Sequence, residues 1–475
     1  MEISYQPYID PDLESIIERI NPPRVCIDNE ACENCTLVKV DSVNKDGILL
    51  DMVQVLTDLD LVISKSYISS DGGWLMDVFH VTDGAGKKLT EGSLLSYIQQ
   101  VMCTNSETGT LTELKAGIKR EVRPFHVSMD HTALEITGTD RPGLLSEISA
   151  AITELEFHIT AGVAWTHSNR VACIVYIEDE IVSGSLTTSE RLAKVVDQLE
   201  NVIEARHGRG ERRSVRLSVP AATQTHTERR LHQMLCSDFD YEPCHGCEGR
   251  EHRTECAAIH VSIEPFKEKG YTVVNVRSRD RPKLLFDTVC ALTDAHYVVF
   301  HASVSSRDAM AVQEYFIRPK SGYCTLDTES GRSKLTQCLI AALERRLPHG
   351  VRLEISTEDR IGLLADVTRA IRENGLSISR AEIGRQAKKA IGTFYVADAT
   401  GGMEVSPQAL QLVRNEIGES VVVINRSPEW TPRGWTRDTV VSRRTIEQEK
   451  AQFSLASLIR SQFERLSSNF GSIRS

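Results

Sequence analysis

The turn from Asp140 to Leu144 joins residue types that could bind a small charged ligand. It includes Arg141 and Gly143, and it lies directly before an apolar pattern of helical spacing. The N-terminus of a helix presents unpaired backbone N–H groups and a partial positive charge, which suit a carboxylate. Glycine has no Cβ, so a ligand can approach the backbone closely. Because the Asp140 carboxylate could take an ammonium group, the turn predicts a site for a molecule that carries both groups.

Three further turns repeat this pattern with changes, at Asn44 and Gly47, at Asp280 and Lys283, and at Asp359, Gly362 and Leu363. Asn44 lacks the negative charge, and Lys283 stands where a glycine is expected and would crowd a ligand. The turns at Asp140 and Asp359 are therefore the better candidates. A purely structural interpretation also fits, because the aspartate would be a good helix N-cap and Pro142 would lie in the first helical turn.

Constant internal spacing indicates that these turns belong to four copies of one unit. We call the first residue of each turn its anchor; the anchors are Asn44, Asp140, Asp280 and Asp359. The distance from one anchor to the next varies, whereas the distances within each copy do not. At the same distance from every anchor a short β-rich triplet begins, with Val62, His158, Val298 and Ser377, and a third strand ends, with Asp83, Asp179, Pro319 and Asp398. Fixed internal spacing with variable connections is the pattern that four folding units of one kind produce.

The elements of each copy follow the order β-α-β-β-α-β. In copy two, strands are predicted over 133–137, 171–177 and 215–219, and a second helix over 189–203. The first helix begins at the turn and has apolar residues at helical spacing. This order predicts an α+β fold of the ferredoxin-like type, with the helices on one face of an antiparallel sheet.

The Asp-Arg-Pro-Gly-Leu-Leu turn within this arrangement resembles the ACT domain, a small-molecule sensing module. Four copies, with the stretches 23–29 and 67–74, resemble the plant ACT-domain-repeat proteins. That family is related to the sensory C-terminal part of bacterial PII uridylyltransferases. The resemblance implies a regulatory protein that binds a free amino acid and has neither a cofactor nor a known reaction. Neighbouring ACT domains often join edge to edge and bind the ligand at the junction.

The repeats divide the chain into an N-terminal arm (1–34), four ACT domains (35–118, 131–220, 270–347 and 348–427), a Cys/His-containing linker (221–269) and a C-terminal tail (428–475). The third and fourth anchors are too close for an ordinary fourth strand in copy three. We therefore predict that copy three is truncated or shares a sheet edge with copy four, because open edges need cover.

Clustered cysteines raise the question of a metal site. Zinc requires four converging sulfur or nitrogen ligands, and Cys236, Cys244, Cys247 and Cys256 could supply them. Their outer spacings match no standard zinc finger, so we interpret them as reduced thiols without a metal. A second C-x-x-C lies at 32–35, and neither pair opens a helix after a strand, which argues against a thioredoxin-type site. His158 and His296, near second strands, are interpreted as structural.

Composition excludes several classes of function. The net charge of −11 argues against a general binder of nucleic acids or anionic membranes. No stretch approaches about 18 uninterrupted apolar residues, and the acidic N-terminus does not resemble a signal peptide. Scattered cysteines favour the cytoplasm, or the nucleus, over an oxidising compartment. Motifs of phosphate binding, hydrolases and metalloproteases are missing, so an enzyme is not expected.

Two hypotheses on function remain open at the level of sequence. The first is a non-catalytic sensor of a free amino acid. The second is a scaffold whose ACT edges pair with a protein partner or a second copy, without a free ligand. A helix expected over 445–467 could dock on its own protein or bind a partner.

Overall fold

The computed structural model describes residues 23–45, 47–71, 73–103, 132–179, 188–205, 213–218, 226–242, 259–307, 309–320, 326–347, 350–386, 388–401, 405–418 and 421–424. Their strands form two antiparallel sheets of eight strands each. Within these residues no helix is long and apolar enough to cross a membrane.

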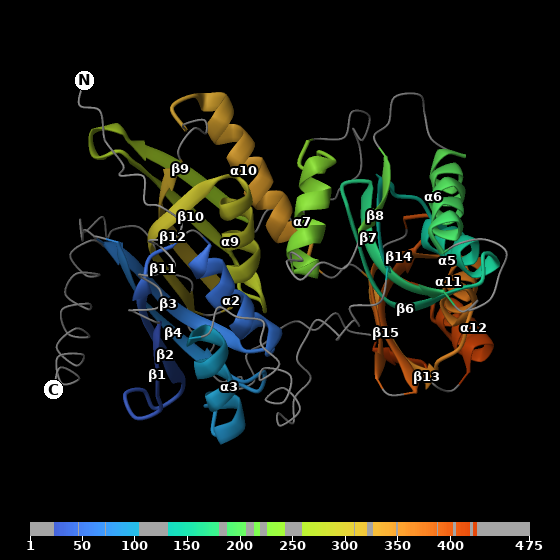
Figure 1. The fold of residues 1–475 in the computed structure, drawn as a ribbon, viewed down its shortest axis with the longest axis horizontal. Coiled ribbons are helices and arrows are strands. Elements are labelled where there is room, and N and C mark those ends of the chain that lie inside the picture. Colours follow the sequence, from blue (N-terminus) through green and yellow to red (C-terminus); the bar gives the residue numbers. More distant parts are fainter. Residues whose placement is uncertain are drawn as a thin grey trace, which may run out of the picture. The chain divides into compact units, whose positions relative to one another are not determined.

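The first sheet combines copies one and three. Its strands, in order across the sheet, are β1 (Arg24–Asp28), β2 (Thr36–Val43), β4 (Trp74–Thr82), β3 (Val62–Asp71), β11 (Tyr297–Arg307), β12 (Met310–Pro319), β10 (Tyr271–Arg279) and β9 (His260–Phe266). Its helices are α2 (Ile48–Asp58), α3 (Gly92–Cys103), α9 (Leu284–Asp294) and α10 (Glu329–Glu344), with a short 3-10 turn, η1 (Lys267–Lys269). Figure 1 shows α2 and α9 on the same face of this sheet.

The second sheet combines copies two and four. Its strands, in order, are β16 (Val421–Ile424), β13 (Val351–Glu358), β15 (Lys389–Asp398), β14 (Leu376–Gln386), β6 (Phe157–His167), β7 (Arg170–Asp179), β5 (Thr132–Thr139) and β8 (Ser214–Ser218). Helices α5 (Leu144–Glu154), α6 (Thr188–Glu204), α11 (Leu363–Glu373) and α12 (Pro407–Ile417) cover one face (Figure 1). The predicted ferredoxin-like α+β class and the antiparallel sheets are therefore confirmed.

In each sheet the two units pair through their central strands, and this pairing has the same register in both sheets. Val163 pairs with Glu382 where β6 meets β14, and Tyr67 pairs with Ser303 where β3 meets β11. All four residues stand equally far along the chain from their own anchors. Each sheet is thus a pseudo-twofold pair of units, which we call pair 1–3 and pair 2–4. The prediction that copy three shares an edge with copy four is wrong.

Copy three is also not truncated, because its edge strand comes from upstream. Strand β9 precedes β10 in the chain and pairs with it through the hairpin at η1. Copy one takes β1 from upstream in the same way. Strand β1 lies in the predicted N-terminal arm, and β9 lies in the predicted linker. Their contribution explains the short spacing between the third and fourth anchors.

Helix α7 (Thr227–Ser237) covers the second face of pair 2–4. Leu231 and Leu235 pack against Trp165 of β6, whereas the neighbouring Ala164 belongs to the core under α5 and α11. Successive residues of a strand point to opposite faces, so β6 is buried on both sides. The same helix contacts α9 of pair 1–3.

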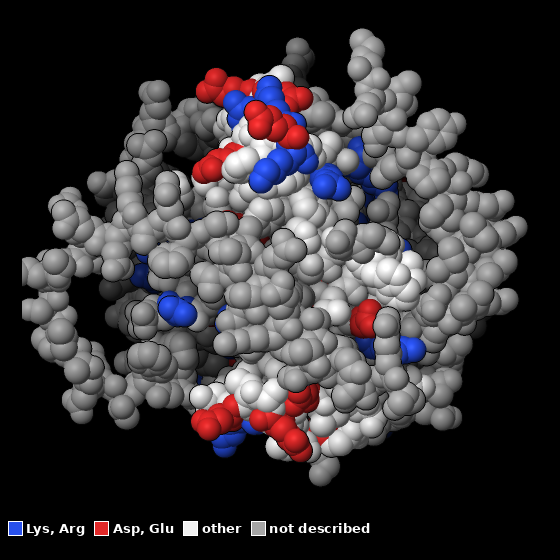
Figure 2. Space-filling model, turned by 90° about the vertical axis from the view of Figure 1, so that its left-hand side faces the viewer, with Lys and Arg blue, Asp and Glu red and all other residues white. Residues whose placement is uncertain are grey.

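On the face drawn in Figure 2, acidic and basic side chains mix at the upper end.

Asp77 is a carboxylate inside an apolar core, and we expect it to lower stability at neutral pH. It lies on β4, 1% exposed, between the buried Leu75 and Phe79. Burial raises the pKa of Asp77 to about 7, although the backbone N–H of Ser69 opposes this shift. The folded state therefore holds a proton that the unfolded chain releases near pH 4, and stability falls as the pH rises from about 4 to 7.

Asp77→Asn should consequently raise the free energy of unfolding at pH 8 by about 1–4 kcal/mol. The gain should fall below about 1 kcal/mol near pH 4, where the folded carboxyl is neutral and the unfolded one is only about half ionised. Urea denaturation at the two pH values measures the effect, with the exposed Asp327 replaced by asparagine as a control. Equal stability of the Asp77→Asn variant and the wild type at pH 8 would contradict the buried, neutral carboxyl.

Candidate functional site

Each anchor ends the first strand of its unit rather than capping the helix. The Asp140 N–H donates to the carbonyl of Asn169, and the Asp359 N–H donates to the carbonyl of Lys388, so both anchors continue the sheet ladder. The helix begins at the fourth position after the anchor, and the residue before it makes no side-chain cap. The expected N-cap role of the anchors is therefore wrong, and Pro142 precedes the helix.

The residue at the third position after each anchor adopts a left-handed backbone conformation. Its φ is 87° at Gly47, 85° at Gly143 and 78° at Gly362. Glycine enters this region without steric cost, which explains its place in the turn. Lys283 adopts the same conformation with φ 64°, and a side chain there costs about 1–2 kcal/mol.

The turn at Asp359 opens into a hollow between the two units of pair 2–4, which we call the Asp359 hollow. It holds about 520 Å³ of space, part of it open solvent. The turn itself supplies Asp359, Gly362 and Leu363, and the end of α5 and the start of β6 supply Thr153, His158 and Thr160. Apolar walls come from Ile355, Val367, Ile383, Ile391 and Phe394.

Two polar side chains meet the Asp359 carboxylate beside this hollow. Nε2 of His158 lies 3.1 Å from Oδ2 of Asp359, and Nε of Arg385 donates to the same oxygen. Nδ1 of His158 is buried and has no hydrogen-bond partner within the described ranges. The arrangement offers a carboxylate, a helix N-terminus and an apolar wall, which together suit a small zwitterion with an apolar side chain.

The turn at Asp140 occupies the equivalent place in the other unit but has less room. Its hollow, the Asp140 hollow, holds about 260 Å³ and is lined by Asp140, Arg141, Gly143 and Leu144 of the turn and by residues of α11 and β14. Arg372 takes the place that Thr153 has in the Asp359 hollow, since the two stand equally far along the chain from their anchors. A Cβ added at Gly143 would lie 2.6 Å from Cδ of Arg372. This long side chain therefore covers the turn.

Burial changes the pKa of the carboxyl group in the turn at Asp140. It raises the pKa of Asp140 to about 6, although the backbone N–H and the positive charge of Arg141 oppose this shift. The Arg141 guanidinium is held by Glu147 and by the carbonyl of Val202. The arginine of the motif thus braces the turn against α5 and α6.

In pair 1–3, residues at the start of α7 lie at the places where pair 2–4 has its two hollows. Nζ of Lys283 lies 3.0 Å from Oε1 of Glu228, and His226 lies 2.8 Å from Asp58 at the end of α2. Arg229 is paired with Asp294 at the end of α9. The turn with Asn44 and Gly47 is separate from the two hollows described above, and a Cβ at Gly47 would meet no atom within 4 Å.

Several predicted features lie outside the described residues. Cys244, Cys247 and Cys256 do so, as does the helix expected over 445–467. Cys236 lies on α7. His158 was interpreted as structural, yet the structure places it in the Asp359 hollow. Thr153 and Arg372 were missed, because only the pairing of copies two and four brings them to the turns. Arg385 was also missed; it lies on β14 of copy four and reaches Asp359 within that unit.

Comparisons with known proteins identify ACT domains in two parts of the chain. Residues 31–109 match the model described as the ACR family N-terminal ACT domain, and residues 351–418 match the ACT domain model. The chain is 51% identical over 486 residues to the ACT domain-containing protein ACR1 of Arabidopsis thaliana, with all of both chains covered. It is 47% identical to ACR3 of the same plant, over 88% of this chain and 90% of the relative.

Two more distant similarities are shorter or weaker. A stretch of 79 residues is 40% identical to the bifunctional uridylyltransferase/uridylyl-removing enzyme of Azospirillum brasilense, covering 17% of this chain and 8% of that enzyme. A solved structure of a putative glycine cleavage system transcriptional repressor covers 45% of this chain and 92% of its own. Its identity is 16% and its TM-score 0.17.

Proposed function

Because the chain belongs to the ACR family of ACT domain-containing proteins, we propose that it is a non-catalytic sensor that binds a free amino acid in the Asp359 hollow. The observation that carries the proposal is the meeting of Asp359, His158 and the glycine turn beside an apolar wall. The expected site residues of copy four supply one side of this hollow. Copy two supplies the other side.

Each group of an amino acid has a complementary group there. The ligand carboxylate would accept hydrogen bonds from the backbone at the start of α11, where the helix N-terminus favours an anion. The ammonium would bind Oδ1 of Asp359, since Oδ2 already accepts from His158 and Arg385. An apolar side chain would lie against Ile383 and Phe394. Charge-assisted hydrogen bonds of this kind contribute about 1.5–3 kcal/mol each.

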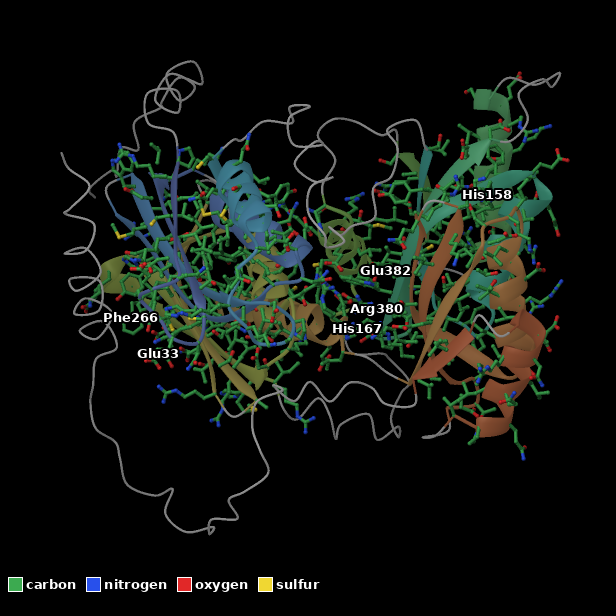
Figure 3. All side chains as sticks on the ribbon, turned by 90° about the horizontal axis from the view of Figure 1, so that it is seen from below. Glu33, His158, His167, Phe266, Arg380 and Glu382 are labelled. Carbon is green, nitrogen blue, oxygen red and sulfur yellow. The ribbon has the colours of Figure 1, made fainter. Side chains whose placement is uncertain are left out.

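Strand β6 offers a route by which binding could reach the rest of the protein. His158 lies in the hollow near one end of this strand, and His167 lies at the other end (Figure 3). His167 is 2.9 Å from Asp240, and it is 3.2 Å from Glu344 at the end of α10. A ligand that prefers one position of β6 would shift the contacts between the two pairs, as population shift requires.

The scaffold alternative receives less support from the sheets. The strands at the centre of each pair, β3 with β11 and β6 with β14, already pair within the chain. A protein partner or a second copy would have to use the outer edges, β1, β9, β8 or β16. The edge that each unit would offer for ACT pairing is therefore taken by its own partner unit.

Isothermal titration of the full chain against the twenty amino acids separates the two functions. The sensor proposal expects at least one amino acid to bind at one site per chain, with a binding constant in the millimolar range or tighter. If no amino acid binds at millimolar concentration, the sensor proposal fails and the scaffold takes its place.

A further inference from the structure

Two cysteines and a histidine converge at the first unit, far along the chain from both hollows. Cys32 and Cys35 lie in the loop before β2, and His80 lies on β4 opposite Leu37 of β2. The two Sγ atoms are 3.0 Å apart, and Sγ of Cys35 is 3.4 Å from Nδ1 of His80. All three donor atoms lie within 4.8 Å of one another. Figure 3 marks the loop by Glu33, which lies between the two cysteines.

The loop that carries the thiols is held in place by its own hydrogen bonds. Oδ1 of Asp28 accepts from the N–H groups of Glu30 and Ala31, both at 2.9 Å, and its Oδ2 is paired with Lys39 at 2.8 Å. Oδ1 of Asn29 accepts from the Thr36 hydroxyl at 2.6 Å. Both ends of the loop are therefore fixed before any ligand binds, so the two thiols need little reordering to converge.

The chemistry of the three donors points to a thiophilic metal ion. Thiolate sulfur and neutral imidazole are the ligands that zinc prefers, and three protein ligands with one open position form a recurrent zinc arrangement. Cys35 is buried, whereas Cys32 is half-buried, so an ion could enter from the side of Cys32. A shift of one cysteine rotamer would widen the sulfur separation to that of two ligands on one ion.

We propose that Cys32, Cys35 and His80 bind one zinc ion, with a solvent molecule as the fourth ligand. On binding, the two thiols release two protons to solvent and the imidazole binds through Nδ1. The two thiolate charges balance the dication. The site would stabilise the N-terminal loop and the β1–β2 edge of pair 1–3, independently of amino-acid binding.

The test uses the full chain, purified with a reductant, stripped with a chelator and loaded with zinc or cobalt. Bound metal is measured by mass spectrometry of the elements, and tetrahedral thiolate coordination by the charge-transfer and d–d absorption of the cobalt form. The proposal expects Cys32→Ser and His80→Asn each to lose one metal ion per chain, or to bind it at least about tenfold more weakly.

Two control variants show whether the bound metal belongs to the Cys32, Cys35 and His80 site. Cys26→Ser removes an exposed thiol of β1 outside the cluster and should leave metal binding unchanged. The double variant Cys244→Ser, Cys247→Ser should also retain the metal of this site. Circular dichroism of the metal-free variants shows that they fold, which separates lost ligands from lost structure.

Two results would overturn the proposal. One is a metal content that Cys32→Ser and His80→Asn leave unchanged. The other is a chain that binds no zinc under reducing conditions. If such a chain also loses two hydrogens on mild oxidation by glutathione disulfide, Cys32 and Cys35 are assigned to a disulfide pair instead.

Discussion

Replacing Arg346 by alanine should lower the free energy of unfolding by about 3–5 kcal/mol, because it leaves buried carboxylates without their cation. Arg346 follows α10 and is 6% exposed. Its guanidinium donates to Oδ2 of Asp287 at 2.9 Å and to Oε1 of Glu228 at 2.8 Å. It also lies 4.8 Å from the ring centre of Trp165. The Arg346 side chain therefore contacts residues of α9, α7 and β6 at once.

The pH dependence of this loss has a definite sign. Burial alone would raise the pKa of Asp287 and Glu228, but the charge of Arg346 and the cations beside it hold the pKa of both well below the usual range. A carboxyl whose pKa is lowered on folding stabilises the protein above its unfolded pKa and loses that contribution as the pH falls. The difference between wild type and Arg346→Ala should thus shrink below about pH 4.

A matched surface pair provides the control. Arg360 is paired with Asp366, and its side chain is 58% exposed, so Arg360→Ala should change stability by less than about 1 kcal/mol. Urea denaturation of the three proteins at pH 7 and at about pH 3 makes the comparison. If Arg346→Ala is no less stable than Arg360→Ala at pH 7, the buried ion pairs do not hold these elements together.

The second large effect is expected at Trp165. Its side chain is fully buried on β6, under Leu231 and Leu235 of α7, and its ring is 5.0 Å from that of His232 in an edge-on arrangement. Trp165→Ala removes this packing and leaves a cavity, which should cost about 3–5 kcal/mol.

Trp165→Phe distinguishes packing from hydrogen bonding. Nε1 of Trp165 is buried without a hydrogen-bond partner within the described ranges, so the phenylalanine loses no hydrogen bond and removes an unsatisfied donor. We expect it to retain more than half of the stability that alanine loses, as measured by urea denaturation. An equal loss in both variants would show that the indole nitrogen makes a bond that matters.

Local patterns in the sequence were enough to predict most elements of each unit, but not the upstream edge strands β1 and β9. The anchors, the apolar spacing of the helix after Gly143 and the alternating strands are short-range signals, and the structure places these elements at the predicted residues. The helical spacing of Leu231, Met234 and Leu235 could have revealed α7 as well. We did not predict α7 because polar residues surround these three apolar ones in the sequence.

Long-range pairing could not be predicted in the same way. Each unit carries a similar edge strand at the same distance from its anchor, so nothing local distinguishes the partner of copy two from that of copy three. The upstream strands β1 and β9 add to this ambiguity because they precede their units. Each hollow forms only where copies two and four pair. Thr153 and Arg372 could therefore be identified as site residues only from the structure.

The pseudo-twofold symmetry of pair 2–4 offers the most direct test of amino-acid binding in the Asp359 hollow. Cγ2 of Thr153 lies 3.3 Å from a Cβ built at Gly362, whereas Arg372 covers the equivalent glycine of the other unit. Thr153→Arg should therefore fill the Asp359 hollow as Arg372 fills its counterpart, without change to the backbone of the turn.

Isothermal titration of the bound amino acid against Thr153→Arg, Arg372→Thr and wild type is the decisive measurement. We expect Thr153→Arg to bind at least about tenfold more weakly, a loss of about 1.4 kcal/mol or more. We expect Arg372→Thr to retain wild-type affinity, and a thermal melt of each variant checks that it folds. Wild-type affinity in a folded Thr153→Arg variant would contradict the assignment of the ligand to the Asp359 hollow.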